Sequence, residues 1–101
     1  MEGLELTAFQ IISSVGTARS CYIEAIQAAK KSDYEEAEKL IKEGDEAFIE
    51  GHDAHAGLLQ KEASGEGNTV NLLILHAEDQ LMSAEAFKTI ALEFIDAYKR
   101  I

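Results

Sequence analysis

The sequence has no proline, no tryptophan and a single cysteine. Without proline the chain lacks the residue that most strongly interrupts helices, so long helices are favoured. A single cysteine cannot form an intrachain disulfide. Cys21 stands between Ala18 and Ala25 in a helical pattern, which indicates a small packed residue rather than a nucleophile.

Basic residues are also scarce. Nine Lys and Arg residues stand against nineteen Asp and Glu residues, which gives a formal net charge of −10. This balance argues against nucleic acid and anionic membrane surfaces as partners, because both are bound by clustered cationic side chains. The acidity suits a partner with a basic face, and it equally suits a protein that is simply kept soluble by its charge.

Long apolar runs are missing as well. No stretch approaches the ~20 residues that a membrane helix needs, and the first residues lack the basic and apolar regions of a signal peptide. We therefore expect a cytoplasmic protein without membrane insertion. Its length predicts one domain over residues 1–101. A lone domain of this size buries only about 60–70 % of its unfolded surface, so association with further copies would add to its stability.

What the sequence does contain is the 3-4 apolar spacing of helices over three long segments. These segments cover residues 4–31, residues from the turn at 30–33 to 58–59, and residues from about Thr69 to Lys99. Ser32 and Glu35 have the spacing of a capping box, and the glycine-containing stretch 64–68 separates the last two segments. The short turn at 30–33 predicts antiparallel neighbours, so the expected fold is all-α, an antiparallel up-down-up three-helix bundle. Gly16 indicates close approach of another helix or of the site, because glycine inside a helix costs about 1 kcal/mol relative to alanine.

The third segment carries an unusual stripe, which is typical either of a core-facing helix or of a coiled-coil seam. Its spacings of 3, 4, 3 and 4 join Leu72, Leu75, Asp79, Met82 and Ala86. A carboxylate on such a seam is costly unless it is paired, protonated or bound to a cation. His76 lies three positions before Asp79, so the two share one side of the helix. Histidine is also the side chain whose protonation state is most easily tuned near neutral pH. In a monomeric bundle, part of the apolar run 72–75 would stay exposed to water. The run therefore predicts association through this segment.

The run 72–82 resembles the active-site motif of the lactose/cellobiose-type enzyme IIA of the bacterial phosphotransferase system. Further agreement lies in residues 16–20, 33–37, 58–59 and 62–65, and in His52, where the family also has a histidine. The resemblance implies a homotrimeric phosphotransferase component with a phosphohistidine intermediate. His76 would accept a phosphoryl group on Nε2 from the phosphohistidine of the carrier protein HPr. It would then pass the group to a cysteine of the sugar-specific IIB component, for uptake of a β-glucoside or disaccharide. The resemblance leaves the sugar open among lactose, cellobiose and chitobiose types.

The resemblance also assigns Asp79 to the threefold axis, where three copies would hold a divalent cation. A hard ion such as Mg²⁺ prefers oxygen ligands, which agrees with that role. Gln80 and Ser83 stand near enough to His76 to be candidates for stabilising the phosphoryl group. The sequence departs from the common pattern at Glu78, where glutamine is expected, and at Gln80, where histidine is expected. Glu78 lies about 200° round the helix from His76 and should point away from it.

Two other functions stay open from the residues alone. The first is a metal-binding helical bundle that uses the three histidines, His52, His55 and His76, together with acidic side chains. Two histidines on one helix do not fill a zinc shell, and no Glu-x-x-His pair recurs on another segment as a di-iron bundle needs. His55 is therefore expected to be a surface or hydrogen-bonded structural residue. The second alternative is a purely structural trimeric module.

Overall fold

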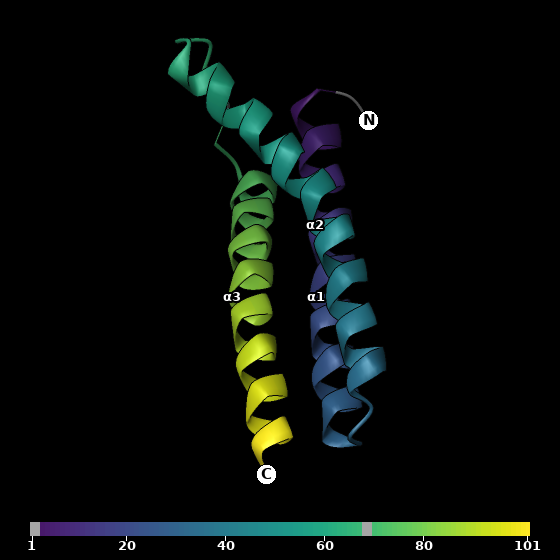
Figure 1. Cartoon of the computed structure of the whole chain (residues 1–101). Helices are drawn as coiled ribbons and strands as arrows, with labels where there is room; N and C mark the ends of the chain where they lie inside the picture. The colour runs from purple at the N-terminus through teal and green to yellow at the C-terminus, as the bar shows by residue number, and fades with distance from the viewer. Residues whose placement is uncertain (1–2, 68–69) are drawn as a thin grey trace.

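The computed structural model describes residues 3–67 and 70–101, and within these residues it contains three helices and no strand. The helices are α1 (Leu4–Lys30), α2 (Tyr34–Ala63) and α3 (Leu72–Arg100). α2 runs in the opposite direction to α1 and α3, and its last turns lean across the start of α3 (Figure 1). The prediction of an all-α fold is confirmed. None of the described helices carries an apolar stretch that could span a bilayer.

The ends of the helices differ from the predicted ends at three places, and the first is that α2 continues to Ala63, beyond the predicted end at 58–59. Asp33, not Ser32, caps α2, and its carboxylate accepts a hydrogen bond from the Glu36 backbone N–H at 3.2 Å. The expected capping box at Ser32 is therefore wrong, since Ser32 has a φ of 63° in the turn instead. The expected start of the third helix, Thr69, lies outside the described residues, and α3 begins only at Leu72, after Asn71. The side chain of Asn71 accepts a hydrogen bond from the Ile74 N–H at 2.9 Å, an N-cap that was not predicted from the sequence.

α1 is the central helix, because its apolar stripe packs against both of the others. The residues of α1 at the 3-4 apolar spacing are buried, and Tyr22 is the largest of them; they are Ala8, Ile11, Val15, Ala18, Tyr22, Ala25 and Ala29. One core cluster joins Ile11 and Val15 of α1 to Leu58 of α2 and to residues at the start of α3. The buried residues of α3 are Ile74, Ala77, Leu81, Ala84, Ala91 and Ile95.

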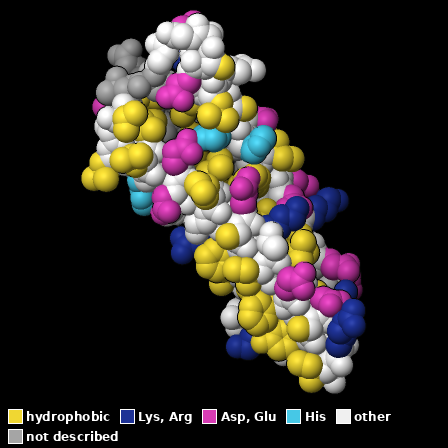
Figure 2. Space-filling view, turned by 90° about the vertical axis from the view of Figure 1, so that its left-hand side faces the viewer, with side chains coloured by type: hydrophobic (Ala, Val, Ile, Leu, Met, Phe, Trp, Pro, Cys, Tyr) yellow, Lys and Arg dark blue, Asp and Glu magenta, His cyan; other side chains and the backbone are white. Residues whose placement is uncertain are grey.

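The stripe that contains Asp79 is not part of this core. Leu72, Leu75 and Met82 are 83 %, 54 % and 63 % exposed, and Asp79 and Ala86 are exposed as well. The core-facing interpretation of this stripe is thus wrong for the single chain. Figure 2, which views the molecule from the α3 side, shows hydrophobic side chains along most of its length. An exposed apolar face of this extent is typical of an interaction surface.

Two glycines of α2 allow α1 and α2 to approach closely. A Cβ at Gly44 would lie 2.6 Å from Cε1 of Tyr22, and one at Gly51 would lie 2.7 Å from Cγ1 of Val15. At Gly16 no atom of the described chain lies within 4 Å of the Cβ position, so the close approach expected there is not found within this chain. At Gly51, α2 lies against Val15 and Ser14 of α1.

This difference among glycines gives a matched pair of substitutions. Gly51→Ala is expected to lower the free energy of unfolding by about 1–3 kcal/mol, because the new methyl group must displace Val15. Gly57→Ala, with no described atom within 4 Å of the added Cβ, should raise it by about 0.5–1 kcal/mol. Urea unfolding of both variants at equal protein concentration measures the two effects. A shift of both variants in the same direction would contradict the close approach at Gly51.

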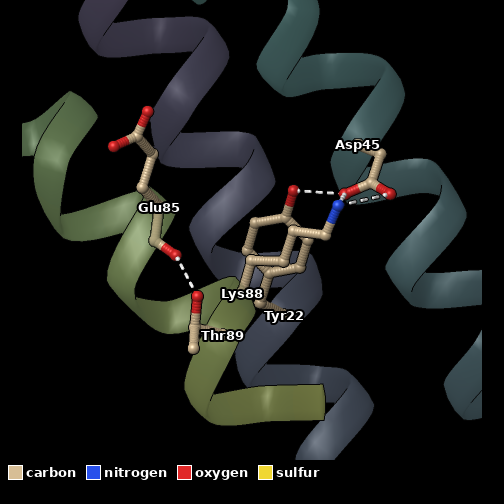
Figure 3. A network of polar contacts seen from close by, with 5 residues as sticks. All are labelled: Tyr22, Asp45, Glu85, Lys88 and Thr89. Atoms are coloured by element: carbon tan, nitrogen blue, oxygen red, sulfur yellow. Dashed lines mark hydrogen bonds and ion pairs between the residues drawn. The ribbon is translucent and has the colours of Figure 1, made fainter.

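A polar network links all three helices near the middle of the bundle (Figure 3). The Tyr22 hydroxyl of α1 donates to Oδ1 of Asp45 in α2 at 2.7 Å, and Nζ of Lys88 in α3 donates to Oδ2 of the same carboxylate at 3.1 Å. Gly44 leaves the space that the Tyr22 ring fills. Burial raises the pKa of Tyr22, and the hydrogen bond to Asp45 raises it further. The phenol therefore stays protonated in the folded chain.

Tyr22→Phe is expected to lower the free energy of unfolding by about 1.5–3 kcal/mol near pH 8, since it removes a hydrogen bond to a charged group. Above about pH 10 the unfolded wild-type chain loses the Tyr22 proton while the folded chain keeps it, so wild-type stability falls as pH rises. The difference between wild type and variant should therefore shrink above that pH. Denaturant unfolding at several pH values tests this, and a difference that stays constant would contradict it.

Candidate functional site

His76 lies in the second turn of α3, close to the helix start that Asn71 caps. Its side chain is exposed, and it makes no hydrogen bond or ion pair with any residue that the structure describes. Ala77, its neighbour in sequence and about 100° round the helix, is buried against α1 and anchors this turn. The imidazole is therefore accessible, and no partner inside the described chain competes for its nitrogen atoms.

Asp79 is one turn further along and is also exposed. Leu75 and Met82 flank it on the exposed stripe, so the carboxylate interrupts an otherwise apolar surface. Within residues 3–67 and 70–101 no three His, Cys, Asp or Glu side chains converge to hold a metal ion. A single chain thus offers one carboxylate oxygen ligand here, and a hard cation would need further ligands from other copies.

Gln80 and Ser83 are partly buried on α3. They follow His76 by four and seven positions, so both lie on its side of the helix, within about 40° of it in azimuth. Gln80 is about 6 Å and Ser83 about 10 Å further along the axis. An amide N–H and a hydroxyl are both donors that suit the oxygen atoms of a phosphoryl group. In one chain Gln80 is therefore the nearer of the two candidates.

The other histidines have different surroundings. His52 is exposed on α2, with its ring centroid 6.0 Å from that of Phe48. His55 is mostly enclosed, and its Nε2 contacts Oε1 of Glu78 in α3. His55 is thus a hydrogen-bonded histidine, as expected. Glu78 faces α2 rather than the exposed side of α3 where His76 lies, but its pairing with His55 was not predicted from the sequence.

Cys21 is buried in α1, in agreement with its interpretation as a packed residue. Burial raises the pKa of the Cys21 thiol, and the nearby carboxylates of Glu43 and Glu24 raise it further. A raised pKa disfavours the thiolate, which is the nucleophilic form. Cys21 therefore adds nothing to the chemistry of the site.

Comparison with known proteins places this chain in a family. The family model described as "PTS system, Lactose/Cellobiose specific IIA subunit" matches residues 6–99. The lichenan-specific phosphotransferase enzyme IIA component of Bacillus subtilis (strain 168) is 42 % identical over 100 residues, covering 99 % of this chain and 91 % of the relative. The oligo-beta-mannoside-specific EIIA component of the same strain is 39 % identical over 95 residues, covering 94 % and 86 %.

A solved structure agrees with these relatives. The crystal structure of the cellobiose-specific enzyme IIA of Bacillus anthracis superposes with a TM-score of 0.94 at 40 % identity, covering 99 % of this chain and 93 % of the other. Family model, relatives and structure each span nearly the whole chain. The chain therefore belongs to the lactose/cellobiose-specific IIA subunits of the phosphotransferase system, which are phosphotransferase components.

Proposed function

We propose that this chain, as a single domain, carries a phosphoryl group on His76 between HPr and a sugar-specific IIB component. The observation that supports His76 is its exposure without an internal partner on the well-anchored second turn of α3, inside the region that the family model matches. A neutral imidazole is a good nucleophile at pH 7.

The transfer consists of two displacements at phosphorus. In the first, Nε2 of His76 forms a bond to the phosphorus atom, and the phosphorus–nitrogen bond of phospho-HPr breaks. In the second, the sulfur of a IIB cysteine forms the bond to phosphorus, and the bond to His76 breaks. Catalysis rests mainly on positioning, with Gln80 and Ser83 as donors to the phosphoryl oxygens.

We further propose that three copies associate through the exposed stripe of α3. Burial of Leu72, Leu75 and Met82 between copies would remove from water the large apolar side chains that one chain leaves exposed. The same contact brings three Asp79 carboxylates together, and like charges this close repel unless a cation or shared protons intervene. A carboxylate cluster fits a hard divalent ion such as Mg²⁺, which would supply the compensating charge at the axis.

In this proposal the transported sugar is recognised by the sugar-specific partner component and not by this chain. The relatives are named for lichenan, an oligo-β-mannoside and cellobiose, and we propose a β-glucoside or disaccharide as the transported class. The metal-binding alternative has no converging set of three ligands within the described residues, so it receives no support from one chain. The structural-trimer alternative differs from the proposal only in leaving His76 unmodified.

The assay that tests the proposal contains phosphoenolpyruvate, enzyme I, HPr and this chain, read by intact mass. We expect the mass to rise by one phosphoryl group per chain, and only when all three added components are present. A chain whose mass never changes would rule out the carrier function and leave the structural trimer as the better description.

A further inference from the structure

The contact between His55 and Glu78 joins the two helices that share the least direct packing. His55 is on α2 and Glu78 on α3, and Nε2–H of the histidine donates to the carboxylate. The His55 side chain is 14 % exposed, and that of Glu78 is 40 % exposed. The hydrogen bond is therefore partly protected from water, which strengthens it relative to a surface contact.

Two other ion pairs cross from α2 to α3 in the described part of the chain. They join Asp45 to Lys88 and Glu38 to Lys99, at increasing distance from the His76 end of the bundle. In both of these pairs α2 supplies the acid and α3 the lysine, whereas the His55–Glu78 pair has the opposite polarity. Its histidine is also the most enclosed of the six side chains. Glu78 lies two residues from His76, so this pair is the one that adjoins the proposed site.

The buried face of α3 mixes large and small side chains, with Ile74 and Leu81 buried on the same face as Ala77. Ala77, Ala84 and Ala91 recur on that face at intervals of seven residues, and each is buried. At the alanine positions the ridges are shallow, so apolar contact there tolerates small rotations of the helix. A directional hydrogen bond restricts the remaining rotation more sharply than apolar contact does.

Rotation of α3 determines where the imidazole points. Glu78 is about 200° round the helix from His76, so holding Glu78 against α2 turns His76 outward. A slip of one residue would rotate His76 by about 100°. The leaning end of α2 supplies both His55 and Leu58, which packs against the cluster containing Ile74 and Ala77 (Figure 1).

We infer that His55 and Glu78 form a positioning pair that fixes the rotation of the first turns of α3 and thereby aims His76 at its phosphoryl donor. The inference rests on the proposed function, because it concerns the same histidine. The pair does not touch the phosphoryl group. Glu78 therefore acts through the orientation of α3, and any side chain that accepts the His55 hydrogen bond in the same place should serve.

Glu78→Ala removes the acceptor, Glu78→Gln keeps an acceptor oxygen, and Glu38→Ala is the matched control at the far end of the α2–α3 contact. At saturating HPr we expect Glu78→Ala to take up phosphoryl about tenfold more slowly than wild type, with less than about twofold change in the HPr concentration that gives half the maximal rate. Glu78→Gln should recover a rate within about threefold of wild type, and Glu38→Ala should match wild type. His55→Ala, which removes the donor instead, should behave as Glu78→Ala does.

Backbone hydrogen exchange provides a readout that does not depend on activity. The amides of residues 74–80 should exchange at least about tenfold faster in Glu78→Ala than in wild type, and should stay slow in Glu78→Gln and Glu38→Ala. Unchanged exchange in Glu78→Ala would overturn the positioning pair, whatever the activity. A Glu78→Gln variant as slow in transfer as Glu78→Ala would overturn it too. A wild type that accepts no phosphoryl would instead defeat the proposed function, and the exchange comparison would still decide the inference.

Discussion

Replacing His76 by alanine is expected to abolish phosphoryl uptake from phospho-HPr. The physical reason is that the imidazole is the nucleophile of the proposed transfer, and alanine offers no atom that can form the bond to phosphorus. His76 is exposed and unpaired within the described chain, so its removal should leave the fold intact. Intact mass after incubation with phosphoenolpyruvate, enzyme I and HPr measures the effect.

The other two histidines are the controls for this experiment. His52→Ala and His55→Ala should still reach one phosphoryl group per chain at the end of the reaction, and only the rate of His55→Ala should fall. Circular dichroism confirms that each variant keeps its helices. Labelling that survives in His76→Ala would show that another residue carries the phosphoryl group.

Two substitutions of Asp79 should have opposite effects on assembly. Wild type is expected to be trimeric with Mg²⁺ present, because the cation offsets three carboxylates whose uncompensated burial would cost several kcal/mol each. Asp79→Leu removes the charges and extends the apolar stripe of Leu75 and Met82, so its trimer should persist without metal. Asp79→Lys places three cations at the axis, where they repel one another and cannot bind Mg²⁺, so it should be monomeric. Light scattering at tens of micromolar protein, with and without a chelator, distinguishes these states.

Glu85→Lys is the matched control, because it makes the same charge change at an exposed position of α3 outside the apolar stripe, with the Glu85 carboxylate pointing away from Asp45 (Figure 3). It should remain trimeric. A wild-type chain that is monomeric in the presence of Mg²⁺ would contradict both the association through α3 and the role of Asp79. If Asp79→Lys and Glu85→Lys had the same oligomeric state, the charge at Asp79 would not be what controls assembly.

The helical content and much of the buried surface could be predicted from the sequence. Apolar residues at 3-4 spacing define one face of a helix, and in α1 that face is the buried face observed from Ala8 to Ala29. His76 and Asp79 could be placed on one side of one helix for the same reason, since three residues are close to one turn. The two helix starts were predicted to within about three positions, but the capping residues, Asp33 and Asn71, were not predicted.

The tertiary structure decided which side of α3 is buried. α3 has apolar residues on two sides, and periodicity within one helix does not say which side packs against α1. Packing against α1 selected the side of Ile74, Ala77 and Leu81, and it left Leu72, Leu75 and Met82 exposed around Asp79. The position of the close approaches, at Gly44 and Gly51 rather than Gly16, follows from where α2 crosses α1. The pairing of His55 with Glu78 depends on the relative rotation and register of two helices, quantities that a local sequence pattern does not contain because they arise only when three helices pack together.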